Sequence, residues 1–144
     1  MNGRDFLSLA KQWAKSRSEA ERRTAVSRAY YAAFHVAREI FEDFGFDVPR
    51  SDRAHKYLAF RLGNSGNNPL RQAGNQLDDL RSDRNRADYD LHVVQGGVHT
   101  DRAVQLGDQI IATLDALPVA DRGTVTSTIR TYERDVLGEV TWRP

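Results

Sequence analysis

SEAERRTAVSRAYYAAFHVAREIFEDFG, residues 18–45, is the segment on which the expected architecture rests. Its apolar side chains recur at steps of four and three, the spacing of one helical face. Ser18 precedes Glu21 by three residues, a capping box in which each side chain satisfies a free backbone N–H of the other residue. Gly45 supplies a left-handed helix end. These signals predict one helix from Ser18 to about Phe44 that forms the spine of the domain. Its apolar face comprises Val26, Tyr30, Ala33, Ala37, Ile40 and Phe44.

Shorter segments on both sides of this helix show the same periodicity, and no segment shows the sustained alternation of a half-buried strand. The sequence therefore predicts an all-α fold, an antiparallel bundle of five to six helices joined by short loops. The further helices are expected over residues 5–15, from Ser51 as cap to Gly63, from Asn68 as cap through Pro69 to about Leu91, and from Thr100 as cap to Leu117.

The last segment gives mixed signals. Residues 124–128 are rich in Thr and Val, which favour strand, whereas Ile129, Tyr132 and Val136 recur at helical spacing. We expect a weak sixth helix followed by a loose tail. The 144 residues then form a single domain with its core over about 5–117 and a C-terminal extension over 118–144.

Composition excludes several classes of protein. The formal charge is +1, so the net charge does not indicate a nucleic-acid-binding protein. The absence of cysteine excludes disulfides and thiolate chemistry. The longest uncharged apolar-rich stretch, residues 29–37, is far shorter than the about 20 residues of a membrane span. The four histidines form no zinc-binding pattern, and no glycine-rich loop has the P-loop form. We expect a soluble cytoplasmic protein with no membrane segment, no metal and no cofactor.

The fourth expected helix breaks the apolar pattern. Arg81, Arg84 and Asp88 lie on one face at steps of three and four, and Arg84 stands where a leucine would fit. Burying an unpaired guanidinium costs several kcal/mol. Arg84 must therefore pair, with Asp88 as the nearest partner, or face a cleft or a subunit interface. A structural ion pair is the simplest interpretation.

The surrounding segment RSDRNRADYDLH, residues 81–92, gathers groups that handle phosphate. Arginine offers a planar fork for phosphate oxygens, and histidine exchanges a proton near neutral pH. Such groups can cleave RNA without a metal. A base takes the proton of the ribose 2′-hydroxyl, guanidinium stabilises the phosphorane charge, and an acid protonates the leaving oxygen.

Two motifs resemble the HEPN domains, a family found in higher eukaryotes and prokaryotes. Residues 27–35, SRAYYAAFH, are similar to the small-residue and aromatic signature of the family's long second helix, and residues 84–89, RNRADY, to its late arginine motif. The resemblance covers about residues 5–117 in helix order. It implies a helical bundle that pairs as a homodimer, often encoded beside a small nucleotidyltransferase as a toxin and antitoxin pair.

The catalytic members of this family are metal-independent RNases. Their site is an arginine and a histidine separated by four to six residues, the first of which is usually polar. Arg84 and Asn85 match the first two positions. Counted from Arg84, His92 lies one residue beyond the window, and counted from Arg86 it lies within it. A branch of the family with an arginine, alanine, aspartate and tyrosine pattern resembles this chain more closely.

These observations lead to two hypotheses. The first is a metal-independent endoribonuclease of a toxin–antitoxin or phage-defence system, in which Arg84 holds the phosphate, Arg86 assists and His92 is the acid or base. The second is a non-catalytic HEPN binding module that partners a nucleotidyltransferase or another protein. For RNA contact we expect Arg81, Asn85 and Arg28, and for a supporting role Asp88 and Tyr89.

The positions of the other histidines in the sequence favour structural roles for them. His35 lies beside the apolar face of the long helix and is expected to pack there. His55 begins the third helix, where it lies either near the arginines or at a solvated helix start. His99 is expected in a mobile loop.

Overall fold

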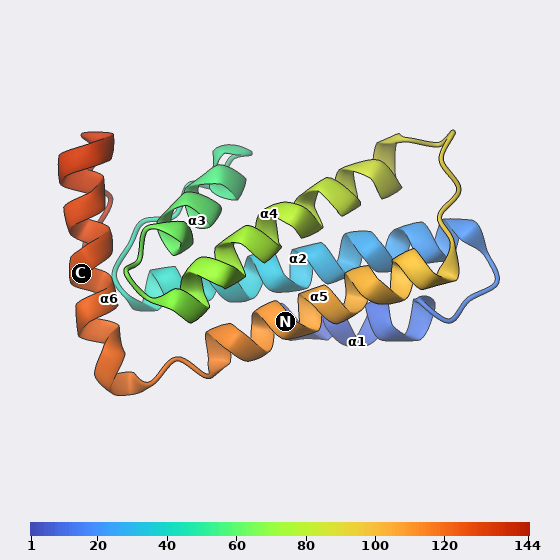
Figure 1. Cartoon of the computed structure of the whole chain (residues 1–144), viewed down its shortest axis with the longest axis horizontal. Coiled ribbons are helices and arrows are strands. Elements are labelled where there is room, and N and C mark those ends of the chain that lie inside the picture. Colours follow the sequence, from blue (N-terminus) through green and yellow to red (C-terminus); the bar gives the residue numbers. More distant parts are fainter.

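The computed structural model describes all 144 residues, from Met1 to Pro144, and consists of six α-helices without a strand (Figure 1). This confirms the all-α bundle and the sixth helix. The helices are α1 (Arg4–Trp13), α2 (Glu19–Asp43), α3 (Arg53–Gly63), α4 (Asn68–Tyr89), α5 (Gly97–Asp115) and α6 (Arg122–Tyr132), with a 3₁₀ turn at Val119–Asp121 and a π-helical turn at Glu133–Leu137.

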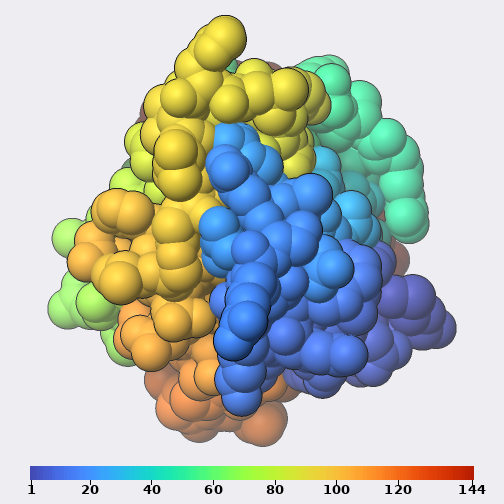
Figure 2. Space-filling model, turned by 90° about the vertical axis from the view of Figure 1, so that its right-hand side faces the viewer, coloured from blue at the N-terminus to red at the C-terminus, as the bar shows by residue number.

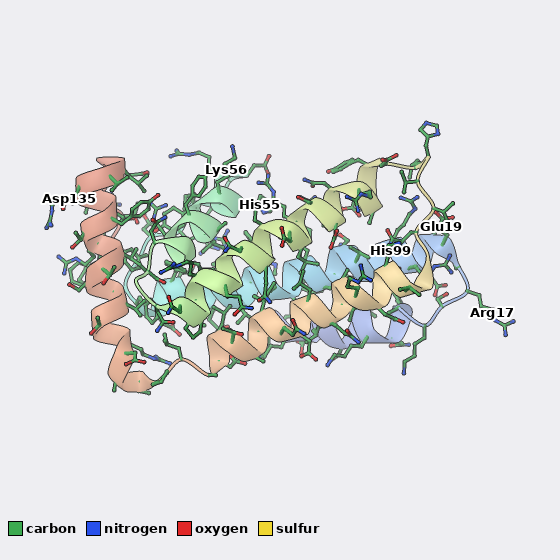
Figure 3. All side chains as sticks on the ribbon, viewed as in Figure 1. Arg17, Glu19, His55, Lys56, His99 and Asp135 are labelled. Atoms are coloured by element: carbon green, nitrogen blue, oxygen red, sulfur yellow. The ribbon has the colours of Figure 1, made fainter.

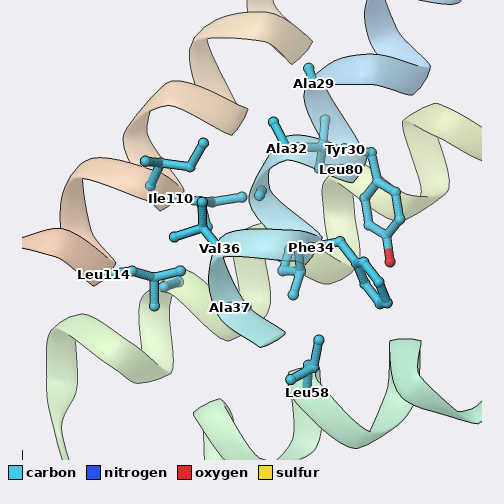
Figure 4. Packing of buried hydrophobic residues seen from close by; sticks show 14 of the residues in the cluster. Ala29, Tyr30, Ala32, Phe34, Val36, Ala37, Leu58, Leu80, Ile110 and Leu114 are labelled. Carbon is cyan, nitrogen blue, oxygen red and sulfur yellow. The ribbon is translucent and has the colours of Figure 1, made fainter. Parts of the chain in front are cut away.

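The long helix α2 is the spine of the bundle, as its periodicity predicts. It packs against α1, α4 and α5, and its small side chains allow these helices to approach closely. At the α2–α5 crossing, a Cβ on Gly107 would lie 3.0 Å from the carbonyl oxygen of Ala29, so a larger residue there would push the two helices apart by a few tenths of an ångström. Figure 4 shows Ile110 and Leu114 on one side of α2 and Leu58 on the other.

The helix starts agree only in part with the sequence. Ser18 caps α2 as predicted, accepting the N–H of Glu21 at 3.3 Å. The reciprocal bond of the capping box is absent, because the Ser18 N–H donates to the Ser16 hydroxyl at 3.0 Å. The cap of α4 is Asn67 and not Asn68. The predicted cap at Thr100 was wrong, because α5 begins three residues earlier at Gly97. The Thr100 hydroxyl instead donates to the Gly96 carbonyl at 2.8 Å, a bond inside the first turn that competes with capping.

The C-terminal tail is docked and not loose. After α6 the chain turns back at Gly138, which has a φ of +63°. The backbone N–H of Thr141 then donates to Glu133 at 3.0 Å, and the Trp142 indole N–H donates to the Phe44 carbonyl at 2.8 Å. These bonds hold the tail against the end of α2, where α6 crosses the bundle in Figure 1.

None of the helices combines the length and the apolar composition that crossing a bilayer requires.

Candidate functional site

The arginine motif of α4 is divided between two faces of the helix. Arg81 and Arg84 point toward α2 and α3, where both influence the ionisation of Tyr30 and His55. Arg86 follows Arg84 by two residues, a turn of about 200° around the helix, and lines a cavity formed with α5. The structure therefore does not bring Arg84 and Arg86 together.

Arg84 is buried, with only 9% of its side chain exposed. Its guanidinium carbon lies 5.5 Å from the ring centroids of both Tyr30 and Tyr31, so the aromatic rings of α2 replace part of its hydration. Its Nη1 lies 3.7 Å from a carboxylate oxygen of Asp88, which confirms the predicted ion pair. Asp88 also accepts the hydroxyl of Ser27 at 3.3 Å.

Two arginine donors of this region have no acceptor. The Nε atoms of Arg84 and Arg81 are buried and make no hydrogen bond. Buried polar groups are almost always paired, and neighbouring guanidinium donors suit an oxyanion. Arg38 and Arg61 each have one unpaired buried donor as well, but those two donors lie outside this region. Asp88 is the one carboxylate in an ion pair with either side chain.

His55 completes the group, although the sequence left open whether it would be solvated. It is buried at the start of α3, where it hydrogen-bonds to the Tyr30 hydroxyl, and its ring lies 4.9 Å from that of Phe34. Burial lowers the pKa of His55, and the positive charges of Arg81 and Arg84 lower it further. The imidazole is therefore held neutral near pH 7, the form that accepts a proton. We call Tyr30, Tyr31, His55, Arg81 and Arg84 the arginine–aromatic cluster.

The tyrosine of this hydrogen bond is a poor acid. Burial raises the pKa of the Tyr30 hydroxyl well above its usual range, despite the opposing charges of Arg81 and Arg84. Tyr30 therefore orients the imidazole and does not titrate at neutral pH.

The remaining predicted residues lie outside the cluster or at its edge. His92 is exposed in the α4–α5 connection, residues 90–96, and makes no hydrogen bond or ion pair. Asn85 and Arg86 are exposed, and Arg86 lies 3.8 Å from Asp83. Tyr89 is exposed with its ring 6.0 Å from the Arg84 guanidinium carbon. Arg28 lies over the rings of Phe6 at 5.2 Å and Tyr31 at 5.9 Å.

His55 was the histidine that sequence reasoning undervalued. A signal was present, because His55 precedes Leu58 by three residues and Leu62 by seven, which places it on the buried face of α3. In Figure 3, His55 lies beside α3, whereas His99 lies toward the opposite end of α4.

No three His, Asp or Glu side chains lie together in an arrangement that would hold a metal ion. Comparison with known protein families, with curated proteins and with solved structures finds no match to this chain.

Proposed function

We propose that the protein is a HEPN-like, metal-independent endoribonuclease whose site is the arginine–aromatic cluster. The observation that carries the proposal is the pair of buried Nε donors on Arg81 and Arg84, without an acceptor, beside the neutral imidazole of His55. A phosphodiester supplies the missing acceptor oxygens. His55 then takes the role that the sequence motif gave to His92.

The chemistry follows from these groups. Neutral His55 removes the proton of a ribose 2′-hydroxyl, and the resulting oxygen attacks the adjacent phosphorus. Arg81 and Arg84 stabilise the charge that develops on the phosphorane. The 5′-oxygen leaves with a proton from an acid, so the products are a 2′,3′-cyclic phosphate and a 5′-hydroxyl. The imidazolium that the first step forms on His55 is this acid, because it returns the proton of the 2′-hydroxyl to the leaving oxygen.

Asp88 partly offsets the positive charge of the site. Its carboxylate is 29% exposed and lies 3.7 Å from Arg84, beyond hydrogen-bond range. The pair neutralises the buried charge while the site is empty, and it leaves the Nε donor available for a phosphate.

The test is incubation of the purified protein with unstructured RNA in the presence of EDTA. We expect cleavage that yields cyclic phosphate ends, and a loss of about 100-fold or more in rate for Arg84→Gln and for His55→Gln. His92→Gln and Arg86→Gln are the matched controls, since they remove the same groups outside the cluster, and each should keep its rate within about twofold. Absence of cleavage, or a loss confined to His92→Gln, contradicts the proposal.

A second candidate function is supported by the surface next to the cluster. Five large apolar side chains are exposed between residues 89 and 98, and Figure 2 shows the α4–α5 connection, in yellow, projecting at one end of the molecule. Such a projection suits a protein partner, in line with a non-catalytic module that binds a nucleotidyltransferase-type antitoxin in the cytoplasm. The side chains are Tyr89, Leu91, Val93, Val94 and Val98.

The two functions depend on different residues, so substitutions distinguish them. A binding module loses its partner when Leu91 and Val94 are both changed to Ser, which pull-down with a nucleotidyltransferase encoded beside the gene would measure. The same double variant leaves the rate of RNA cleavage unchanged if the cluster is a nuclease site. Partner binding that survives the double variant contradicts the docking role.

A further inference from the structure

A cavity of about 210 Å³ lies where α3 meets the C-terminal tail, at the α6 end of the bundle (Figure 1). Side chains of α3 line one side of it, and Leu137 and Glu139, on the two sides of the Gly138 turn, line the other. It shares no residue with the arginine–aromatic cluster. Its volume is below the range of about 300–1,000 Å³ that is usual for small-molecule sites. A single amino-acid residue or a small anion is therefore a more suitable occupant than a nucleotide.

Positive charge is in excess in this cavity. Arg53, Lys56 and Arg61 line it, and Glu139 is the one carboxylate among the lining residues. Arg53 is 76% exposed and lies 3.6 Å from Glu139. Lys56 is exposed and makes no ion pair or hydrogen bond with the protein. The charge balance therefore favours an anionic ligand.

Arg61 provides a fixed donor at the base of the cavity. Its Nε donates to Glu133 at 2.8 Å and its Nη1 to the Tyr57 carbonyl at 3.4 Å. Its Nη2 is buried and has no hydrogen-bond partner. The guanidinium is thus held in one orientation with one donor left unused. Such a donor binds an anion without the cost of ordering a flexible side chain.

Glu139 indicates which kind of anion the cavity attracts. Its carboxylate lies between the two arginines, 3.6 Å from the Nη2 of Arg53 and 3.7 Å from the Nη2 of Arg61. Both distances are beyond hydrogen-bond range, and the side chain is 45% exposed. The backbone N–H of Glu139 donates to the Glu133 carbonyl at 3.1 Å, so the side chain can turn away while the tail stays in place. A carboxylate with better geometry can therefore replace it.

Apolar side chains lie beside these charges. Phe60 is 54% exposed and Leu137 is 37% exposed, and both line the same cavity. An aliphatic group next to the bound anion would cover them, whereas inorganic phosphate would leave them in contact with water. At the C-terminus of a polypeptide, a carboxylate and a side chain are attached to the same carbon atom, which places the two groups side by side.

We propose that this cavity binds the C-terminus of a partner polypeptide that ends in an aliphatic residue. The terminal carboxylate replaces that of Glu139 and contacts Arg53, Lys56 and the free Nη2 of Arg61. The last side chain lies against Phe60 and Leu137. The inference concerns a site outside the proposed nuclease site and outside the apolar surface between residues 89 and 98.

The test is a nuclear magnetic resonance titration of the full ¹⁵N-labelled chain at pH 7 with a four-residue peptide that ends in leucine. The Nε–H signal of Arg61 reports binding, because its bond to Glu133 protects it from exchange with water. We expect the peptide with a free carboxylate to shift this signal and to bind at least about tenfold more tightly than the same peptide with a C-terminal amide. No shift at millimolar peptide, or equal binding of the amide, overturns the proposal.

Two small anions identify the source of the carboxylate. We expect 4-methylpentanoate, which has the aliphatic group and the carboxylate of leucine without a peptide, to bind at least about fivefold more weakly than the peptide. Inorganic phosphate, which has no aliphatic group, should bind more weakly as well. Binding of 4-methylpentanoate as tight as that of the peptide overturns the assignment to a polypeptide. Equal binding of phosphate overturns the assignment to a carboxylate.

Variants at the rim locate the ligand and leave Arg61 in place. Glu139→Gln should strengthen peptide binding by about three- to tenfold, because it removes the internal competitor. Lys56→Gln should weaken binding by about fivefold, because it removes a positive charge. Lys15→Gln, at an exposed lysine of the α1–α2 connection, is the matched control and should leave the affinity unchanged. Weaker binding in Glu139→Gln, or an equal loss in Lys15→Gln, overturns the proposal.

Discussion

Two buried arginines of this protein are paired in different ways. Arg61 of α3 is 4% exposed and donates from Nε to Glu133, which is fully buried, at 2.8 Å. Its Nη2 lies 3.7 Å from a second carboxylate, that of Glu139, and makes no hydrogen bond, and its guanidinium carbon lies 3.5 Å from the ring centroid of Tyr57. Arg84 of α4 is nearly as buried, yet its nearest carboxylate is 3.7 Å away and its Nε has no acceptor.

The difference lies at the Nε donors, because that of Arg61 is bonded to a buried carboxylate and that of Arg84 has no acceptor. Glu133 is itself held by the backbone N–H and the hydroxyl of Thr141, so the Arg61 pair belongs to a network that fixes the C-terminal tail. Arg84 is surrounded by aromatic rings and one partly exposed carboxylate, and no comparable network uses its donors. Equal burial of two charges thus does not imply equal pairing.

The largest effect on stability is expected for Glu133→Gln. This change leaves the Arg61 charge buried beside a neutral amide, which lowers the free energy of unfolding by about 3–5 kcal/mol. Urea unfolding followed by circular dichroism measures it. A loss below about 1 kcal/mol would remove the distinction between the two arginines. The double variant Arg61→Met with Glu133→Leu should recover most of the loss, since it removes both charges.

The matched acid-to-amide change at the other arginine, Asp88→Asn, should cost only about 1 kcal/mol. Its carboxylate is partly hydrated already and lies beyond hydrogen-bond range of Arg84. RNA affinity, measured by fluorescence anisotropy, should rise because the positive charge of the site is no longer offset. A stability loss as large as that of Glu133→Gln would make Arg84 a structural arginine as well.

Acid should destabilise the protein through its buried histidines. The pKa values of His55 and His35 are both lowered, chiefly by burial, from the usual 6.5. Below that pH the unfolded chain binds protons that the folded chain does not, so stability is fully present above about pH 6.5 and falls as the pH drops. Between pH 7.5 and 5.5 we expect the melting temperature to fall by about 2–4 °C.

His55→Gln should reduce this slope and leave the part due to His35. His99→Gln is the control, because His99 is exposed, and the slope should be unchanged. A slope that His55→Gln does not alter would show that burial, together with the charges of Arg81 and Arg84, does not keep this imidazole neutral.

The smallest effect is expected at the rim of the Arg61 network. Arg53 is exposed and lies 3.6 Å from Glu139, so Arg53→Gln should cost less than about 0.5 kcal/mol. Thermal unfolding at low and high salt measures it. A cost above 1 kcal/mol would mean that the network extends to the surface.

The local sequence pattern was sufficient to predict the presence of the helices and the ion pair on α4. Periodicity placed α2, and the step of four from Arg84 to Asp88 predicted their ion pair correctly. The start of α5 was missed because the Thr100 hydroxyl bonds within the first turn, where a threonine cap and an internal threonine look alike in sequence.

Contacts between distant residues could not be predicted in this way. His55 meets Tyr30 across 25 residues, and Arg61 meets Glu133 across 72 residues. The apolar periodicity of one helix predicts which face of that helix is buried, but it does not predict which residue of another helix packs against this face. For the same reason the motif suggested that Arg84, Arg86 and His92 act together, whereas helix geometry directs Arg86 to another face and the connection carries His92 into solvent.

The docked tail determines where the polypeptide can be shortened. An expression product that stops at Leu117 would lack Glu133 and Thr141, so the Arg61 guanidinium would lose its acceptor and the Tyr57 hydroxyl its hydrogen bond. It would also lose the isolated backbone bridge between Phe46 and Trp142. The smallest autonomous unit therefore extends at least to Trp142, and residues 118–142, which resemble an appendage in sequence, are required for a stable product.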